Sequence, residues 1–404
     1  MRVFPIKTLL PKKDDAQRIA SLGSGKLSAE VLQSKAQALP ESYLRVVKPQ
    51  FLDSSLMSET QAFYDASRAN LSKLLKEKFL LVHEPNVFLY EQTHHSGKKI
   101  AGWIVGVDAE DYLDGRIKKH ENTLTSKENR LVRHISALES MAEPVLLSQQ
   151  LPVELNQLVL AITSKRDADL SVSDEFYNTH KVWKVEIKEE IDLVCKLLNN
   201  LPSLYIADGH HRCASSSRYL TERFGNNSGK GIMALIADES ELLIKPFFRM
   251  LKGVDSTILW DFLEEHRIHH YEIGHSLGFE DLKKGQVLCI AKDRRCVIEL
   301  SESMLGDKAI DKLDVRVVEK KILQPAFGLS SSSEDDRYQF LRGDTPLDSI
   351  KLQLQNGDID LAFLFAPNQM EEVRAVADEG DTMPAKSTFI EPKIPTGLII
   401  EDYR

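Results

Sequence analysis

Hydrophobic and polar positions follow two different periods along the chain, and together they predict a mixed α/β protein. Apolar residues recur with helical spacing over residues 27–39, 58–78, 126–141, 189–201, 256–266 and 370–381. Short apolar or alternating runs typical of strands lie at 43–49, 79–93, 98–112, 156–163, 180–187, 203–208, 231–238, 287–292 and 296–300. Because the two kinds of element are interspersed, we expect an α/β (α+β) fold with mixed sheets.

The segment around residue 208 gives the clearest local architecture. The apolar run SLYIAD (203–208) is followed at once by Gly209 and then by HHRCASSSRYLTERF, which has helical spacing. The chain is therefore expected to pass from a buried strand through a glycine turn into a helix at this point.

The chain is long enough for two domains. We expect one at residues 1–230, which includes the strand, glycine and helix, and a second α/β region at 231–404. The serine-rich acidic stretch 330–336 is typical of an exposed loop or linker, and no internal repeat is present.

Composition narrows the class of partner. Lys and Arg total 52 against 61 Asp and Glu, a net charge of -9 over 404 residues. An acidic surface argues against a nucleic-acid or anionic-membrane binder, so a phosphate site must be a local cluster. The N-terminus lacks the apolar stretch of a secretory signal, and no segment is apolar enough to span a membrane. With four cysteines and no CxxC pair, we expect a cytoplasmic protein.

The first group of residues with potential chemistry is the run from Asp208 to Arg212. A strand that ends in Asp-Gly and opens a helix presents backbone N–H groups and the positive end of the helix dipole to an anion. Gly209 allows close approach, Arg212 can bind two phosphate oxygens, and His210 and His211 add donors. The alternative is an ordinary helix cap with exposed histidines.

The second group is the basic segment 116–130, RIKKHENTLTSKENR. It combines the cations Lys118, Lys119 and Arg130 with His120 and one embedded carboxylate, Glu121. Phosphoryl transfer needs cations for the donor and a base for the acceptor hydroxyl, and this segment offers both. A solvated basic loop is the alternative.

Several common motifs are missing from the sequence. It contains no GxGxxG, no GxxxxGK[ST], no GxSxG and no HExxH. The common Rossmann, P-loop, α/β-hydrolase and zinc-protease signatures are therefore absent.

Motifs along nearly the whole chain resemble the bacterial family known as domain of unknown function 1015. They occur in order: VFPIKTLLP, PESYLRVVKP, DGRIKKHENT, KENR, HKVWKV, IADGHHR, LDVRVVEKKILQP and MPAKSTFIEPKIPTGLII. The chain departs from the family pattern at Cys213-Ala214-Ser215, where an aromatic residue followed by Glu or Ala is usual.

The DGHHR unit is also similar to the phosphate-binding box of the ParB/sulfiredoxin-like fold, including free-serine kinases. This resemblance implies that residues 208–212 hold nucleotide phosphates. It implies an upstream catalytic Glu, which Glu121 matches by its order in the chain and its chemistry.

The resemblance implies a kinase that transfers a phosphoryl group from ATP or ADP to a hydroxyl, with free L-serine as the acceptor. Glu121, Asp208 and His210 are the expected catalytic residues, with Asp208 placed to orient Mg²⁺. The expected phosphate-binding residues are Lys118, Lys119, His120, Arg130, Gly209, His211 and Arg212. Magnesium would enter with the nucleotide, and we expect no metal site formed by protein ligands alone.

Two other functions stay open. A nucleotide-hydrolysing switch would use water in place of the hydroxyl acceptor, and a regulator would bind nucleotide without turnover. In each case the expected partners are a nucleotide and a small molecule, with no nucleic acid or membrane; a homodimer is compatible with the sequence.

Overall fold

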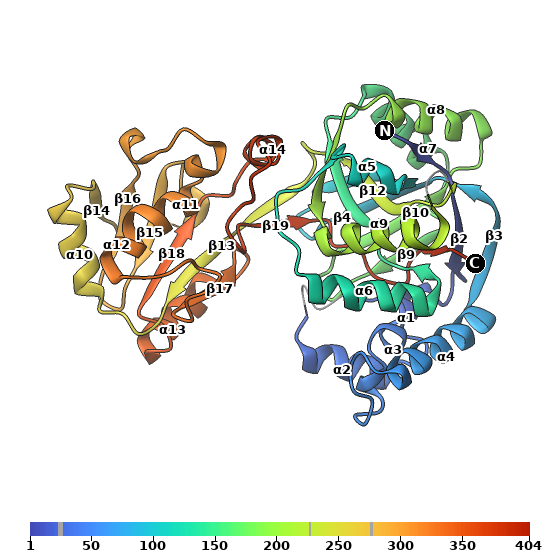
Figure 1. Cartoon of the computed structure of the whole chain (residues 1–404), viewed down its shortest axis with the longest axis horizontal. Coiled ribbons are helices and arrows are strands. Elements are labelled where there is room, and N and C mark those ends of the chain that lie inside the picture. The colour runs from blue at the N-terminus through green and yellow to red at the C-terminus, as the bar shows by residue number, and fades with distance from the viewer. Residues whose placement is uncertain (23–26, 226–227, 275–277) are drawn as a thin grey trace. The chain divides into compact units, whose positions relative to one another are not determined.

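The computed structural model describes residues 1–22, 27–225, 228–274 and 278–404, and it confirms a mixed α/β fold with several sheets (Figure 1). The chain forms two compact units. The first contains Met1–Lys118, Asn122–Leu242 and Pro392–Arg404; the second contains Lys119–Glu121 and Leu243–Glu391. The division falls after Leu242 and not at the expected 230–231, because the strand 232–238 pairs on both sides within the first unit.

The larger sheet of the first unit contains the strand that was expected to carry the phosphate turn. Its strands run in the order β6 (Ile117–Lys118), β11 (Leu204–Asp208), β8 (Val145–Gln149), β12 (Ile232–Asp238), β5 (Lys99–Val107), β4 (Phe88–Thr93), β10 (Thr179–Lys184) and β9 (Leu170–Ser173), and β1 (Val3–Phe4) pairs with β5. β11 is parallel to β6 and antiparallel to β8. Its residues Leu204 and Ile206 are fully buried, as the apolar run predicts.

A smaller sheet of the same unit joins the two ends of the chain. Its order is β3 (Phe79–Asn86), β2 (Ile6–Pro11), β20 (Ile400–Asp402) and β7 (Ser140–Met141). Helices of this unit are α1 (Ala16–Ile19), α2 (Ala29–Ala38), α3 (Leu44–Val47), α4 (Gln61–Lys78), α5 (Ala109–Leu113), α6 (Thr125–Leu138), α7 (Val153–Lys165), α8 (Lys188–Asn199) and α9 (His210–Phe224), with a 3₁₀ turn at Pro49–Phe51.

Two of the expected strands are helices. Residues 43–49 form α3 and the start of the 3₁₀ turn; Leu44 and Val46 are nonetheless buried, and Pro49 begins the new turn. Residues 156–163 lie inside α7, which buries Leu158 and Ile162 while Leu160 is 69 % exposed. A short apolar run does not distinguish a strand from a helix that is buried on one side.

The second unit contains a seven-stranded sheet. Its order is β14 (His270–Glu272), β16 (Arg295–Glu299), β15 (Gln286–Ile290), β18 (Leu361–Phe365), β13 (Leu243–Leu251) and β17 (Tyr338–Arg342), and β19 (Thr388–Glu391) pairs with β13. Helices α10 (Ser256–Glu265), α11 (Asp314–Val318), α12 (Gln324–Phe327), α13 (Leu347–Asn356) and α14 (Met370–Asp378) complete it, with a π-helical segment at Glu319–Leu323 and 3₁₀ turns at Phe279–Asp281, Glu302–Met304 and Ala309–Lys312. The stretch 330–336 is a loop within this unit.

Within the described residues, none of the helices combines the length and the apolar character that crossing a membrane requires.

Candidate functional site: the turn at Gly209

The predicted strand, glycine and helix are present in the structure. β11 ends at Asp208, Gly209 has a φ of 95°, and α9 begins at His210. This left-handed conformation is one that side chains rarely adopt, so the turn requires a glycine. The pairing of β11 with β8 shifts register between Ile206 and Asp208, and such a bulge redirects the side chain that follows it.

Arg212 folds back over the turn from the first turn of α9. Its Nη2 donates to Oδ2 of Asp208 at 2.7 Å. A Cβ built on Gly209 would lie only 2.8 Å from this Nη2 and 2.9 Å from Nε, so the missing side chain makes room for the guanidinium. Burial lowers the pKa of Arg212 to about 10, and the group therefore stays positively charged at neutral pH.

Two residues that were not among the expected site residues also lie at this turn. Glu143 forms an ion pair with Nη1 of Arg212, and Lys393 forms one with Oδ1 of Asp208. Glu143 precedes β8, and Leu146 of β8 pairs with Asp208, so the antiparallel register places Glu143 near the end of β11. The signal for Glu143 was an acidic residue just before an apolar run. Lys393 lies within the MPAKSTFIEPKIPTGLII segment of the family resemblance, but 185 residues from Asp208.

The part of the basic segment that lies in helix α6 packs beside the helix that follows the turn at Gly209. Helices α6 and α9 pack side by side (Figure 1). The Ser215 hydroxyl donates to the carbonyl of His211 at 2.7 Å and lies 3.4 Å from the carbonyl of Glu128 in α6. Burial, together with the positive charges of Lys127 and Arg130, lowers the pKa of His211. The structure thus brings Arg130 and His211 into one electrostatic environment.

Lys118 also belongs to this neighbourhood. β6 pairs with the first half of β11, with Lys118 opposite Tyr205. The ammonium of Lys118 lies 5.7 Å from the centre of the Tyr205 ring. It therefore lies along β11, while Asp208 is three residues further along that strand.

Lys119, His120 and Glu121 belong to the second unit. The carbonyl of His120 accepts a hydrogen bond from the backbone N–H of Met383 at 2.8 Å, which ties this short segment to that unit. Burial lowers the pKa of His120 to about 4, so its imidazole is neutral at neutral pH and adds no positive charge to the segment. The roles of Lys119 and of Glu121 as catalytic base stay predictions.

His210 and Cys213 are the buried residues of the first turn of α9. The exposed fraction is 5 % for His210 and 0 % for Cys213. Burial raises the pKa of the Cys213 thiol well above its usual value, so this residue fills space as a neutral thiol. Cys213 is therefore a small, neutral residue of the core, and the catalytic role of His210 stays a prediction.

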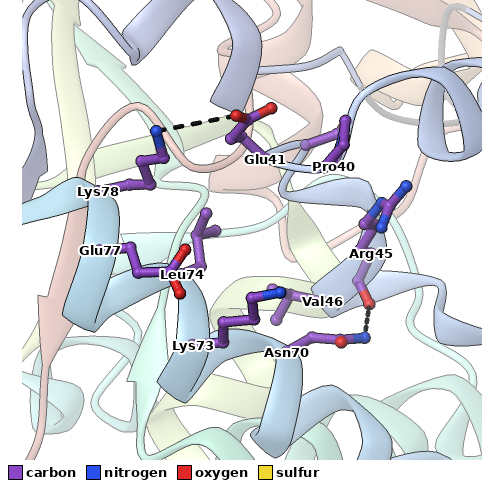
Figure 2. Close-up of a pocket in the computed structure, with 10 residues that line it drawn as sticks. Pro40, Glu41, Arg45, Val46, Asn70, Lys73, Leu74, Glu77 and Lys78 are labelled. Carbon is purple, nitrogen blue, oxygen red and sulfur yellow. Dashed lines mark hydrogen bonds and ion pairs between the residues drawn. The ribbon is translucent and has the colours of Figure 1, made fainter.

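Figure 2 shows a separate hollow of the first unit, between the segment around α3 and the helix α4. Its volume is about 110 Å³, well below the usual range for a pocket that holds a small organic ligand. Its polar groups also bind one another: Lys78 lies 3.8 Å from Glu41, and the Asn70 side chain donates to the carbonyl of Arg45 at 2.8 Å. The Gly209 turn is the stronger candidate.

Among the residues that the structure describes, no cluster of three or more His, Cys, Asp or Glu side chains is arranged to hold a metal ion.

Comparison with known proteins identifies a family without a known activity. The model of the family described as "Protein of unknown function (DUF1015)" matches residues 3–316. No curated protein sequence matches the chain.

Several solved structures have a limited similarity to this chain. A conserved hypothetical protein from Pyrococcus furiosus is 15 % identical, with a TM-score of 0.35 over 72 % of this chain and 93 % of that one. A free serine kinase in complex with AMP is 14 % identical, with a TM-score of 0.37 over 73 % and 92 %. SbnI with a C-terminal truncation, from Staphylococcus aureus, is 13 % identical, with a TM-score of 0.37 over 72 % and 87 %. TM-scores this low assign no function to this chain.

Proposed function

The chain belongs to the DUF1015 family of proteins of unknown function, and from this premise we propose that the turn at Gly209 binds the phosphate groups of a nucleotide. The observation that carries the proposal is the arrangement of Arg212. Its charged guanidinium lies over a glycine with positive φ, at the N-terminus of a helix of 15 residues. Guanidinium groups and helix N-termini both favour phosphate oxygens.

The surroundings of the turn support an anionic ligand. Lys393 places a second cation at Asp208, and the positive charges of Lys127 and Arg130 reach His211 from α6. The chain as a whole is acidic, and at this turn two cations lie close together with two carboxylates, so the cations form a local cluster. A small phosphorylated molecule matches such a site better than a polyanion does.

We further propose that the protein is a phosphotransferase that uses ATP or ADP, with L-serine as the acceptor to test first. Phosphoryl transfer depends on positioning and on charge stabilisation, which Arg212, Lys393 and the backbone N–H groups of α9 would supply. Glu121 would accept the proton of the acceptor hydroxyl. Mg²⁺ typically binds one or two carboxylates together with substrate phosphates, and Asp208 is the carboxylate at the turn that would contribute.

The test uses the purified full chain. We expect ATP or ADP with Mg²⁺ to give a binding isotherm by calorimetry, and incubation with L-serine to give phosphoserine by mass spectrometry. Arg212→Ala should weaken nucleotide binding by about 100-fold and abolish the formation of phosphoserine. Arg218→Ala is the matched control, because Arg218 lies on the same helix with a side chain that is 43 % exposed and pairs with Glu222.

The products separate the three functions. Phosphate release without an amino acid would identify a hydrolase, and tight binding without any product would identify a regulator. Absence of nucleotide binding by the wild-type chain would overturn the proposal.

A further inference from the structure

The charges at the Gly209 turn are already balanced within the protein. Asp208 and Glu143 supply two negative charges, and Arg212 and Lys393 supply two positive ones. A phosphate group that approached this cluster would have to compete with the two carboxylates for the same two cations. An inference about these residues rests on the function proposed above.

The two carboxylates are not held equally. Asp208 accepts from Nη2 of Arg212 and forms an ion pair with Lys393, so its two oxygens have different cationic partners. Glu143 has one ion-pair contact with the cluster, at Nη1 of Arg212, and its side chain is 36 % exposed. Release of Glu143 into water therefore breaks one contact, whereas release of Asp208 breaks two.

A carboxylate and a phosphate bind a guanidinium in the same way. Each offers anionic oxygens that accept parallel N–H donors, so the two compete for one edge of the arginine. The edge held by Glu143 is the Nη1 side of Arg212, while Nη2 stays anchored on Asp208. Glu143 thus holds the place that a phosphate oxygen would take.

We propose that the phosphate of the nucleotide displaces Glu143 from Nη1 of Arg212, and that Lys393 is a direct phosphate-binding residue of the same site. Glu143 acts as an internal competitor that keeps the arginine positioned when no nucleotide is bound. Asp208 pairs with both Arg212 and Lys393 and so holds the two cations close together. Lys393 supplies the second cation for the phosphate.

The test compares the affinities of two variants with their controls, using calorimetry on the full chain. The probes are inorganic pyrophosphate, ADP and adenosine. Glu143→Gln keeps the size of the side chain and removes its charge, so both phosphate probes should bind about five- to tenfold more tightly. Lys393→Met should bind both about tenfold or more weakly.

Controls exclude general charge and folding effects. Glu154→Gln changes an exposed glutamate of α7 in the same unit, and Lys188→Met changes a lysine of α8 whose side chain is 73 % exposed. Neither should change the affinity. Adenosine has no phosphate, so its affinity should be the same in Glu143→Gln and in the wild type.

The outcomes separate this inference from the proposed function. If wild-type protein binds ADP but Glu143→Gln binds it equally or more weakly, or if Lys393→Met binds it as well as wild type, the inference is overturned and the phosphate site stands. If neither the wild type nor any variant binds pyrophosphate or ADP, the proposed function fails and the inference fails with it. Melting curves of each variant confirm that it is folded.

Discussion

Arg212 of the first unit binds two acidic side chains and Arg249 of the second binds three groups, and the two clusters also differ in their access to water. Arg249 is fully buried: Nε donates to Oε1 of Glu319 at 2.6 Å, and its two terminal nitrogens donate to the carbonyls of Lys386 and Ala385 at 2.7 and 2.8 Å. The Arg212 side chain is 19 % exposed, and its two acidic partners are 31 % and 36 % exposed.

The two arginines also differ in how completely their nitrogens are hydrogen-bonded. Each nitrogen of Arg249 has a protein partner, and the Phe340 ring lies 4.7 Å from its guanidinium carbon. In Arg212, Nε is buried and makes no hydrogen bond among the described residues. A buried, fully bonded ion pair fixes the conformation of its surroundings, whereas partly exposed partners can exchange for a ligand. We therefore expect Arg249 to hold its surroundings in one conformation and Arg212 to be able to exchange its acidic partners for a ligand.

The largest expected effect comes from breaking the buried pair. Arg249→Met leaves Glu319 without its cation, and removal of one partner of a buried pair costs about 3–5 kcal/mol of unfolding free energy. Urea denaturation measures this loss, and hydrogen exchange should place it in residues 243–391. An unchanged midpoint would contradict the structural role of Arg249.

The next largest effect is a pH dependence of stability that we expect from Glu401, a buried glutamate of the first unit. Burial raises the pKa of Glu401 to about 8 from the usual 4.5, although the Tyr403 hydroxyl donates to it at 3.0 Å. Between these pH values the folded protein keeps a proton that the unfolded chain has lost. The contribution of Glu401 to the free energy of unfolding should therefore be largest below about pH 4.5. It should decrease toward pH 8, by at most about 1.4 kcal/mol per pH unit.

Glu401→Gln should remove this part of the pH dependence, because glutamine is neutral at every pH. Urea midpoints of the variant and the wild type, measured from pH 5 to 8, provide the comparison. If the two profiles have the same slope, Glu401 does not carry the proton.

Arg212→Ala gives the opposite result to Arg249→Met. We expect loss of nucleotide affinity by about 100-fold, with less than about 1 kcal/mol lost from the unfolding free energy, since its partners can hydrate. Calorimetry and urea denaturation on the same preparation measure both. A large loss of stability would show that Arg212, like Arg249, is a structural arginine.

The smallest effect should come from Gly209→Ala. The new methyl group would lie within 3 Å of the Arg212 guanidinium and would require a left-handed backbone. We expect about tenfold weaker nucleotide binding and about 1 kcal/mol lower stability. Gly225→Ala at the end of the same helix is a useful control, because Gly225 also has positive φ but no atom lies within 4 Å of its added Cβ. Equal affinities of the two variants would remove the steric argument.

The sequence predicted local features better than long-range ones. The turn at Gly209 was predictable because an apolar run, an Asp-Gly pair and helical spacing are adjacent, and each depends on neighbouring residues. Residues 43–49 and 156–163 were wrongly predicted as strands because their apolar runs fit either period, and packing against the rest of the unit decided the outcome.

The site itself was only partly predictable. Asp208 and Arg212 lie four residues apart on either side of the turn at Gly209, so this local turn brings them together. Glu143 and Lys393 reach Asp208 through sheet pairing and through the return of the C-terminal segment, which local patterns do not encode. His120 was expected to bind phosphate, but burial, which composition does not reveal, keeps it neutral.

Hydrogen exchange of the full chain with and without ADP and Mg²⁺ tests the central claim most directly. If the Gly209 turn binds the phosphates, the backbone amides of residues 208–213 should gain protection in the wild type and in Arg218→Ala, but not in Arg212→Ala. Protection that arises elsewhere while these amides are unchanged, or that persists in Arg212→Ala, would contradict the account.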